Sequence, residues 1–336
     1  MSTPIMTKLF VICEAGLLPL RMKLMKALRF HSFGSPEVLT IEEMAQPVSG
    51  EGEVLVHIKA AGLNPSDVGN VAGRFHATTL PRVPGRDFAG VLAPGGEFVW
   101  GSVPGFGMTR DGSHAEYVVA PKDAISIAPR SLSAEQAAAV GVPYTTAWGA
   151  LIRSAQLRAG ETVLITGAAG AVGQAATQIA NWKGARVLGA TRGGSASPGA
   201  AAVVDTTADM RARVFELTDG KGAEVVFDTV GGSLFEPALR CLGLGGRQVA
   251  ISSGKEPRVS FSLVDFYHNM SRLIGFDSYS YTPRDTAQIL DELRGGFESG
   301  ALIAPQVKPV ALADAVAAYQ DVAGGRAQTK LVLIPS

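Results

Sequence analysis

Apolar and polar positions follow two different patterns before and after Pro143. From Met25 to Pro143, short apolar runs, some with period-2 alternation, are separated by Gly and Pro, which is typical of β-strands. Helical periodicity is scarce here apart from Ala134–Val140. This half predicts a compact, partly barrel-like β domain. Its clearest predicted strands are Glu53–Ala60, Phe88–Leu92, Phe98–Trp100 and Ala115–Ala120, and Met25 opens a first strand.

After Pro143 the pattern changes, and Thr145–Leu157 predicts a helix. Six apolar runs then alternate with helical segments, which indicates βαβ units and a parallel sheet. The chain closes with two helical stretches, Pro283–Ser299 and Ala311–Ala323, and the strand Lys330–Pro335. Because doubly wound sheets commonly stop at six strands, we expect this tail to return to the first domain. The six predicted strands are Thr162–Thr166, Arg186–Ala190, Ala202–Val204, Val225–Asp228, Gln248–Ser252 and Leu273–Phe276.

The patterns therefore predict an α/β protein of two domains. Residues 25–143 form the β domain, residues 144–276 the dinucleotide-binding domain, and residues 277–336 complete the β domain. Residues 1–24 are predicted to be an extension without chemistry. Their apolar run Leu9–Leu20 is interrupted by Glu14 and is too short to span a bilayer, and no clear cleavage site follows it.

The balanced charge of the chain argues against nucleic acid and membranes as binding partners. Lys plus Arg equals Asp plus Glu at 30 each, so no net charge draws the protein to nucleic acid or to a membrane surface. A small-molecule substrate fits this balance. Cys13 and Cys241 are too few and too far apart for a disulfide framework, which favours a reducing, cytoplasmic location.

The run from Thr162 to Gln174 is the most informative stretch, because an apolar strand leads through a Gly- and Ala-rich turn into a helix. Such a turn lets the backbone approach a pyrophosphate, and the helix start offers free N–H groups to it. A Gly-rich turn without a ligand would look similar, but the order strand, turn, helix, strand favours dinucleotide binding. The predicted contacts are Gly167, Ala168, Ala169, Gly170, Ala171, Val172 and Gly173.

The next strand ends in Thr191 and Arg192, and no acidic residue stands beside them in the sequence. NAD-specific sites usually place an acid about 20 residues past the glycine turn. Arg192 occupies that region, and a guanidinium there could pair with the 2′-phosphate of NADPH. The alternative is an exposed loop arginine. We predict NADPH as the cofactor.

Six motifs in this order resemble the medium-chain dehydrogenase/reductase superfamily, specifically its zinc-independent quinone oxidoreductase branch. They are Gly62–Asp67, Pro81–Val91, Gly112–Val118, Val142–Trp148, Phe227–Gly232 and Thr329–Leu333. The resemblance implies a GroES-like catalytic domain around a Rossmann domain, with a cleft between them. It places Thr146, Ser252, Ser253 and Lys330 near the cofactor, Asn64 toward the nicotinamide and substrate, and a homodimer along an edge of the Rossmann sheet.

Zinc-dependent members of this superfamily carry a Cys and a Gly-His-Glu run where this chain has Asn64 and Gly85-Arg86-Asp87. Two cysteines cannot form a four-Cys site, so no metal is predicted. His57, His76 and His114 are expected to be hydrogen-bonded or surface side chains. The branch often has two tyrosines after the Asn motif, and Val68–Phe75 contains none, so a phenol proton donor is not carried over.

We therefore predict a zinc-free, NADPH-dependent oxidoreductase that passes a hydride to a quinone or similar conjugated carbonyl. Asn64 would polarise the acceptor oxygen and Asp67 would orient it, although Asp67 could equally be a turn residue. Tyr144 and Phe75 either line the pocket or belong to the core. One alternative is a reductase of 2-alkenals, enones or enoyl thioesters. Another is a non-catalytic NADPH-binding redox sensor.

Overall fold

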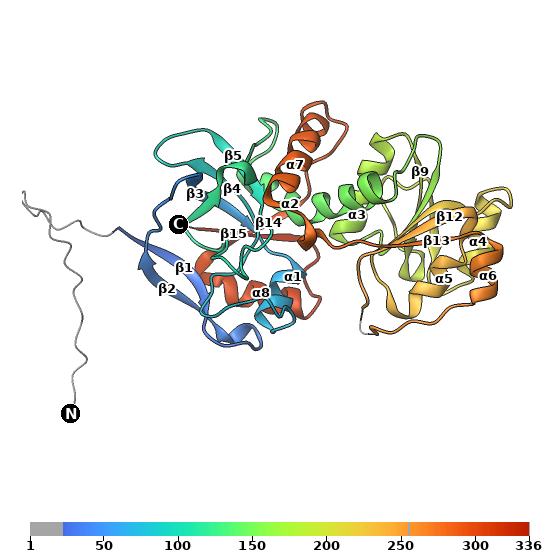
Figure 1. Cartoon of the computed structure of the whole chain (residues 1–336), viewed down its shortest axis with the longest axis horizontal. Helices are drawn as coiled ribbons and strands as arrows, with labels where there is room; N and C mark the ends of the chain where they lie inside the picture. The colour runs from blue at the N-terminus through green and yellow to red at the C-terminus, as the bar shows by residue number, and fades with distance from the viewer. Residues whose placement is uncertain (1–22, 255, 336) are drawn as a thin grey trace, which may run out of the picture.

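The computed structural model describes residues 23–254 and 256–335. The extension predicted over residues 1–24 lies almost wholly outside the described residues, and the first strand, β1 (Leu24–Phe30), begins one residue before its predicted start. Figure 1 shows two lobes, a mostly β lobe and an α/β lobe. A six-stranded parallel sheet in one lobe and a mixed sheet in the other confirm the predicted α/β class. Within the described part, no helix has the length and apolar character needed to cross a bilayer.

The α/β lobe is built on a six-stranded parallel sheet in the order β10-β9-β8-β11-β12-β13. β8 is buried along its whole length because helices cover both faces of the sheet. The strand order reverses between β8 and β11, where such sheets bind their ligands. The strands are β8 (Thr162–Thr166), β9 (Arg186–Thr191), β10 (Ala202–Asp205), β11 (Ala223–Asp228), β12 (Leu242–Ala250) and β13 (Arg272–Gly275).

Helix α3 (Ala171–Trp182) covers one face of this sheet and packs with Val163, Ile165 and Val187. Three shorter helices, α4 (Met210–Leu217), α5 (Phe235–Leu239) and α6 (Leu263–His268), contribute to the core on the other face around Leu164 and Leu188. β12 begins six residues before its predicted start. The prediction missed these residues because Gly243, Gly245 and Gly246 interrupt the apolar pattern there.

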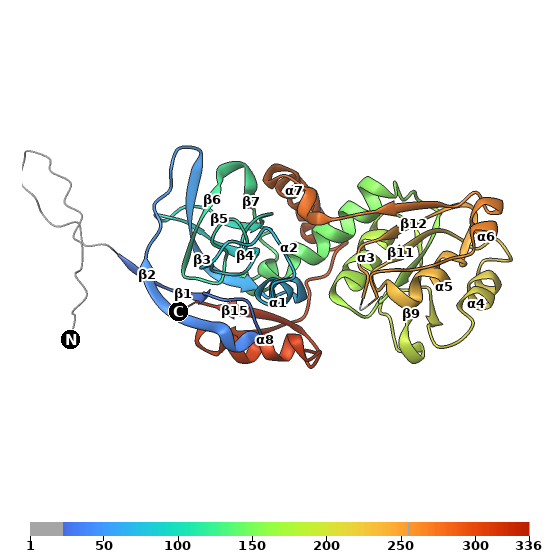
Figure 2. The same ribbon diagram turned by 60° about the horizontal axis from the view of Figure 1, so that its bottom comes forward.

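The β lobe contains a seven-stranded mixed sheet in which β14-β15-β3-β4-β5-β7 are neighbours and β6 also pairs with β3. β15 pairs antiparallel with β3, so the end of the chain joins the lobe that its beginning forms (Figure 2). β1 and β2 form a separate antiparallel pair. The bounds are β2 (Leu39–Ala45), β3 (Glu53–Gly62), β4 (Asp87–Leu92), β5 (Phe98–Ser102), β6 (Tyr117–Pro121), β7 (Ser126–Ile127), β14 (Val307–Ala311), β15 (Lys330–Ile334), α1 (Pro65–Val71), α7 (Pro283–Glu298) and α8 (Ala315–Ala323).

Helix α2 (Ala134–Trp148) crosses the boundary that we placed after Pro143. The predicted break between two helices there is wrong, since α2 runs through Pro143 and continues as a π-helical turn over Gly149–Ser154. A proline removes an N–H and crowds the preceding turn, which usually ends a helix. Here the Asp87 carboxylate accepts the Val142 N–H at 3.0 and 2.9 Å and supports the backbone beside the proline.

Candidate functional site

A cavity of about 580 Å³ lies at the carboxyl ends of β8 and β11 and is lined by residues of both lobes. Its position coincides with the reversal of strand order in the parallel sheet, as expected for a cofactor cleft. Eight of the predicted site residues line it: Asn64, Thr146, Gly167, Gly170, Ala171, Val172, Gly173 and Lys330.

The glycine turn connects β8 to α3 on one wall of this cavity. Gly167 has a φ of +61°, and Gly170 precedes the first residue of α3. A Cβ on Gly173 would lie 2.3 Å from the Gly167 carbonyl oxygen and 2.6 Å from the Ala168 Cα, so only glycine lets the helix approach the turn this closely. The first N–H groups of α3 stand beside this compact turn, and the arrangement fits a pyrophosphate.

The ends of β8 and β11 are tied together beside the turn. The Thr166 hydroxyl donates to the buried Asp228 carboxylate at 2.7 Å, and the backbone N–H groups of Val230 and Gly231 donate to the same oxygen. The Thr229 hydroxyl donates to the Thr166 carbonyl at 2.7 Å and lines the cavity. This network holds the turn against the neighbouring strand.

Arg192 directly follows β9 and is exposed in a turn, and an acid lies closer to it than the sequence indicated. Asp205 at the end of β10 accepts the Gly193 N–H at 2.8 Å and both the N–H and hydroxyl of Thr207. These hydrogen bonds, chiefly those from Thr207, lower the pKa of Asp205. Parallel pairing of β9 with β10 brings this carboxylate to the turn. Thr191 is buried and its hydroxyl donates to the Ser195 carbonyl.

The other predicted cofactor residues fall into two groups. Ala169 is exposed and lines an adjoining cavity of about 370 Å³, together with Tyr144. Ala168 is buried in the core, and Ser252 and Ser253 are exposed in the loop after β12 without lining either cavity. Ile251, just before them, lines the larger cavity instead.

Asn64 is buried at the start of α1, and both ends of its amide have partners. Its Nδ2 donates to Asp87 Oδ2 at 2.8 Å, and the Lys330 ammonium donates to its Oδ1. Asp87 also accepts the Ser102 hydroxyl at 2.7 Å. Lys330, which we expected against the cofactor, thus contacts Asn64 and lines both cavities. Asp67 does not line the larger cavity; it accepts the Asn64 backbone N–H at 2.8 Å.

Burial and neighbouring charges perturb two groups of this cluster. Burial raises the pKa of Asp67 from 3.8 to about 6, against the opposing effect of the Arg86 guanidinium. Burial lowers the pKa of Lys330, while Asp87 and Asp67 oppose that shift. An ammonium whose pKa is lowered gives up its proton more readily than a free lysine. The cluster therefore offers a proton donor and hydrogen-bond donors beside the cavity.

Comparison with known proteins identifies the family. Residues 50–130 match the alcohol dehydrogenase GroES-like domain, and residues 171–294 match the family described as zinc-binding dehydrogenase. A quinone oxidoreductase of Sus scrofa is 33% identical over 329 residues, covering 93% of this chain and 98% of that protein. The chain belongs to the medium-chain dehydrogenase/reductase superfamily. It is an oxidoreductase of the quinone oxidoreductase-like type, which confirms the predicted superfamily and its quinone oxidoreductase-like members.

Other similar proteins carry names of both the alcohol dehydrogenase-like and the quinone oxidoreductase type. A zinc-type alcohol dehydrogenase-like protein of Schizosaccharomyces pombe is 38% identical over 290 residues, covering 83% of this chain and 86% of that protein. The crystal structure of a quinone oxidoreductase of Pseudomonas syringae superimposes with a TM-score of 0.81 at 29% identity, covering 93% of this chain and all of that one. A mycobacterial structure complexed with NADPH has a TM-score of 0.80 at 28% identity, with the same coverage. A Rossmann-type domain that binds a nicotinamide dinucleotide is thus established for this oxidoreductase.

The described part of the chain contains no cluster of metal-ligating side chains. Residues 23–254 and 256–335 contain no group of three or more His, Cys, Asp or Glu residues that could hold a metal ion. His114 is buried and lies near Tyr319, with its Nδ1 2.9 Å from the phenol oxygen. Burial lowers the pKa of His114 to about 4, so it stays neutral. His57 stacks on Tyr117 with ring centroids 4.6 Å apart.

Sequence reasoning missed several cavity residues because they lie outside the recognised motifs or were read differently. Arg86 was considered only as a replacement for a zinc-ligand run, yet it lines the cavity. Tyr279 lies in the 3-10 turn Ser278–Ser280 after β13 and lines the cavity. The only sequence signal for it was an aromatic residue that follows the sixth predicted strand. Thr229, Ile251 and Phe276 line the cavity as well. Phe75 was not missed: the sequence left it open between pocket and core, and it lines the cavity.

Proposed function

We propose that this oxidoreductase transfers a hydride from NADPH to a quinone or a similar conjugated carbonyl, without zinc. One observation carries the proposal: a single cavity joins the glycine turn of α3 to the Asn64–Lys330 pair. When bound, the reduced nicotinamide supplies the hydride. The relatives named quinone oxidoreductase, and the mycobacterial neighbour complexed with NADPH, support the same choice of acceptor and cofactor.

The residues of this chain would provide orientation and charge stabilisation. Negative charge develops on the acceptor oxygen, so N–H donors beside it lower the barrier. Lys330 has two further N–H donors besides the one that Asn64 accepts, and Asn64 has a second amide hydrogen. Asp87 fixes the orientation of the Asn64 amide, and Asp67 holds its backbone. In this proposal Arg192 binds the 2′-phosphate from its exposed turn.

The test is oxidation of NADPH by the purified protein with 1,4-benzoquinone and with a 2-alkenal, and NADH serves as control. Rapid turnover selective for NADPH is expected with at least one acceptor, and the faster acceptor separates a quinone reductase from an enone reductase. An Asn64→Ala variant should lose turnover and keep its affinity for NADPH. Tight NADPH binding without reduction of any acceptor would instead favour a redox sensor.

We also propose a homodimer in the cytoplasm. β13 is an edge strand of the parallel sheet, and apolar side chains are exposed on it and on the preceding helix and turn. The exposed side chains are Leu263, Val264, Tyr267, Met270 and Leu273. Light scattering should give twice the mass of one chain, and a Leu273→Asp variant should be monomeric. An unchanged mass in that variant would exclude this edge.

A further inference from the structure

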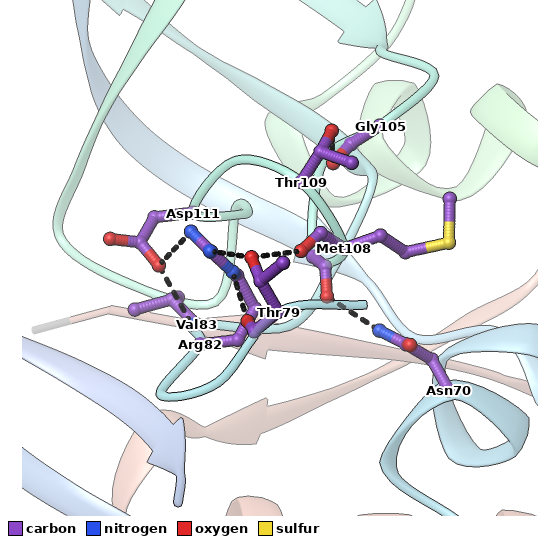
Figure 3. Close-up of polar contacts among 9 residues, drawn as sticks. Asn70, Thr79, Arg82, Val83, Gly105, Met108, Thr109 and Asp111 are labelled. Atoms are coloured by element: carbon purple, nitrogen blue, oxygen red, sulfur yellow. Dashed lines mark hydrogen bonds and ion pairs between the residues drawn. The ribbon is translucent and has the colours of Figure 1, made fainter. Parts of the chain in front are cut away.

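Two arginines four residues apart meet different surroundings. Arg82 is satisfied within the protein, as Figure 3 shows: its Nε donates to the Thr79 carbonyl at 3.0 Å, and its terminal nitrogens reach Asp111 at 3.1 Å and the Thr79 hydroxyl at 2.5 Å. Arg86 is only 5% exposed, yet across residues 23–254 and 256–335 its side chain has one hydrogen-bond partner, the Ser66 hydroxyl at 3.0 Å. Its Nε is buried without a partner.

The nearby carboxylates do not pair with Arg86. In the described part of the chain, no carboxylate oxygen lies within 4.0 Å of its nitrogens. Asp67 is turned to the Asn64 backbone, and Asp87 accepts Asn64, Ser102 and Val142. A guanidinium carries five N–H donors, and burying it without acceptors is unfavourable. Apart from the hydrogen bond to Ser66, the terminal nitrogens of Arg86 have no protein partner in the described residues, so these nitrogens are the groups offered to a ligand in the cavity.

Arg86 lies on the cavity wall in a fixed plane. The Tyr279 ring covers its guanidinium, with the central carbon 4.0 Å from the ring centroid, and Phe75 packs on Tyr279 with centroids 5.0 Å apart. Stacking on one face leaves the edges of the guanidinium, where its N–H groups lie, for planar recognition. Tyr279 belongs to the segment that returns from β13, whereas Arg86 belongs to the β lobe. Both residues, together with Ser66, line the cavity that holds the glycine turn.

We propose that Arg86, stacked on Tyr279, binds a carboxylate of the hydride acceptor, so that the substrate is a small unsaturated keto acid or a quinone acid. A carboxylate matches the guanidinium edge with two parallel hydrogen bonds, whereas a lone carbonyl oxygen cannot. Lys330 adds a second cation in the same cavity, and Phe75, Phe276 and Ile251 provide apolar contacts for the carbon skeleton. This inference rests on the proposed hydride transfer and specifies its acceptor.

For a keto acid such as β-acetylacrylate the reaction balances with the reduced nicotinamide as the only reductant. The hydride adds to the alkene carbon remote from the ketone, the carbon–carbon π bond breaks, and a proton adds to the carbon beside the ketone. The product is levulinate. Arg86 takes no part in these bond changes; it positions the carboxylate.

The experiment compares β-acetylacrylate with its methyl ester, which has the same skeleton without the charge. The intact protein should prefer the acid roughly 10- to 150-fold in kcat/KM, the range expected for hydrogen bonds to a charged group. Arg86→Met should abolish this preference through KM, and Arg86→Lys should retain part of it. Arg284→Met removes an exposed arginine, changes the net charge equally and should leave the preference intact.

Binding of levulinate to the cofactor-free protein, measured by calorimetry, gives a readout independent of turnover. Loss of this binding in Arg86→Met, with unchanged thermal unfolding, supports the proposal. If levulinate binds through Arg86 but no acceptor oxidises NADPH, the proposed hydride transfer fails while the carboxylate site stands. Equal rates for acid and ester in the intact protein, or a weakened affinity for NADPH rather than for the acid in Arg86→Met, would overturn it.

Discussion

Replacing Gly173 by alanine tests whether close approach of α3 to the glycine turn positions the phosphate site. The added Cβ would lie 2.3 Å from the Gly167 carbonyl oxygen and 2.6 Å from the Ala168 Cα, and both are backbone atoms that cannot rotate away. Overpacking of this kind destabilises a protein by about 1–3 kcal/mol. For a domain of this size that lowers Tm by roughly 2–12 °C. The Gly173→Ala protein without cofactor should therefore melt earlier.

Gly170→Ala provides the matched control, because a Cβ at that position meets only the Gly167 carbonyl oxygen, at 3.3 Å. Its Tm without cofactor should stay within about 2 °C of the parent, in line with small surface effects. Movement of the turn in Gly173→Ala should also remove at least one hydrogen bond to phosphate, which raises the Kd for NADPH roughly 10- to 150-fold. Differential scanning calorimetry and fluorescence titration measure both quantities. Equal melting of the two variants, with NADPH bound as tightly as by the parent, would refute this account of the turn.

Three further predictions concern the charged groups. Burial raises the pKa of Asp67 to about 6 and lowers the pKa of His114 to about 4. Between about pH 4 and pH 6, the raised pKa of Asp67 therefore makes the free energy of unfolding fall as the pH rises, by about 3 kcal/mol. The lowered pKa of His114 makes the free energy of unfolding rise over the same window, by a similar amount. Urea unfolding should thus show stability rising with pH more steeply in Asp67→Asn, and falling with pH in His114→Gln; parallel profiles would contradict the opposing shifts. Arg192→Gln should raise the Kd for NADPH about tenfold and leave the Kd for NADH unchanged, as measured by fluorescence titration. Asp205→Asn should lower the Kd for NADPH, because a carboxylate near the proposed 2′-phosphate site is lost. Asp87→Ala leaves the partners of a buried carboxylate unpaired and should lower the free energy of unfolding by about 3 kcal/mol or more, with loss of turnover; full activity would show that Asp87 does not position Asn64.

The parts of this protein that depend on local pattern could be predicted from the sequence. The three central residues of β8 are apolar because the strand is buried on both faces, and the glycines after it are needed where α3 closes on the turn. Both features depend only on residues that are neighbours in the sequence, so the strand, the turn and the helix were predicted in the correct order. The return of the C-terminal segment to the first domain was also expected, since a six-stranded sheet leaves that segment without a place, and the structure pairs its strand β15 with β3.

The rest depends on residues that lie far apart in the sequence. Asp87 stands 55 positions before Val142 and still supports the backbone of α2 at its proline, so the helix continues where the local pattern predicts a break. Asp205 reaches the Arg192 turn only because β10 pairs with β9. Arg86 and Tyr279 are far apart in the sequence and meet on one cavity wall. Periodicity records which face of an element is buried, but it carries no information on which elements pack together, and the partners of a charged side chain follow from that packing.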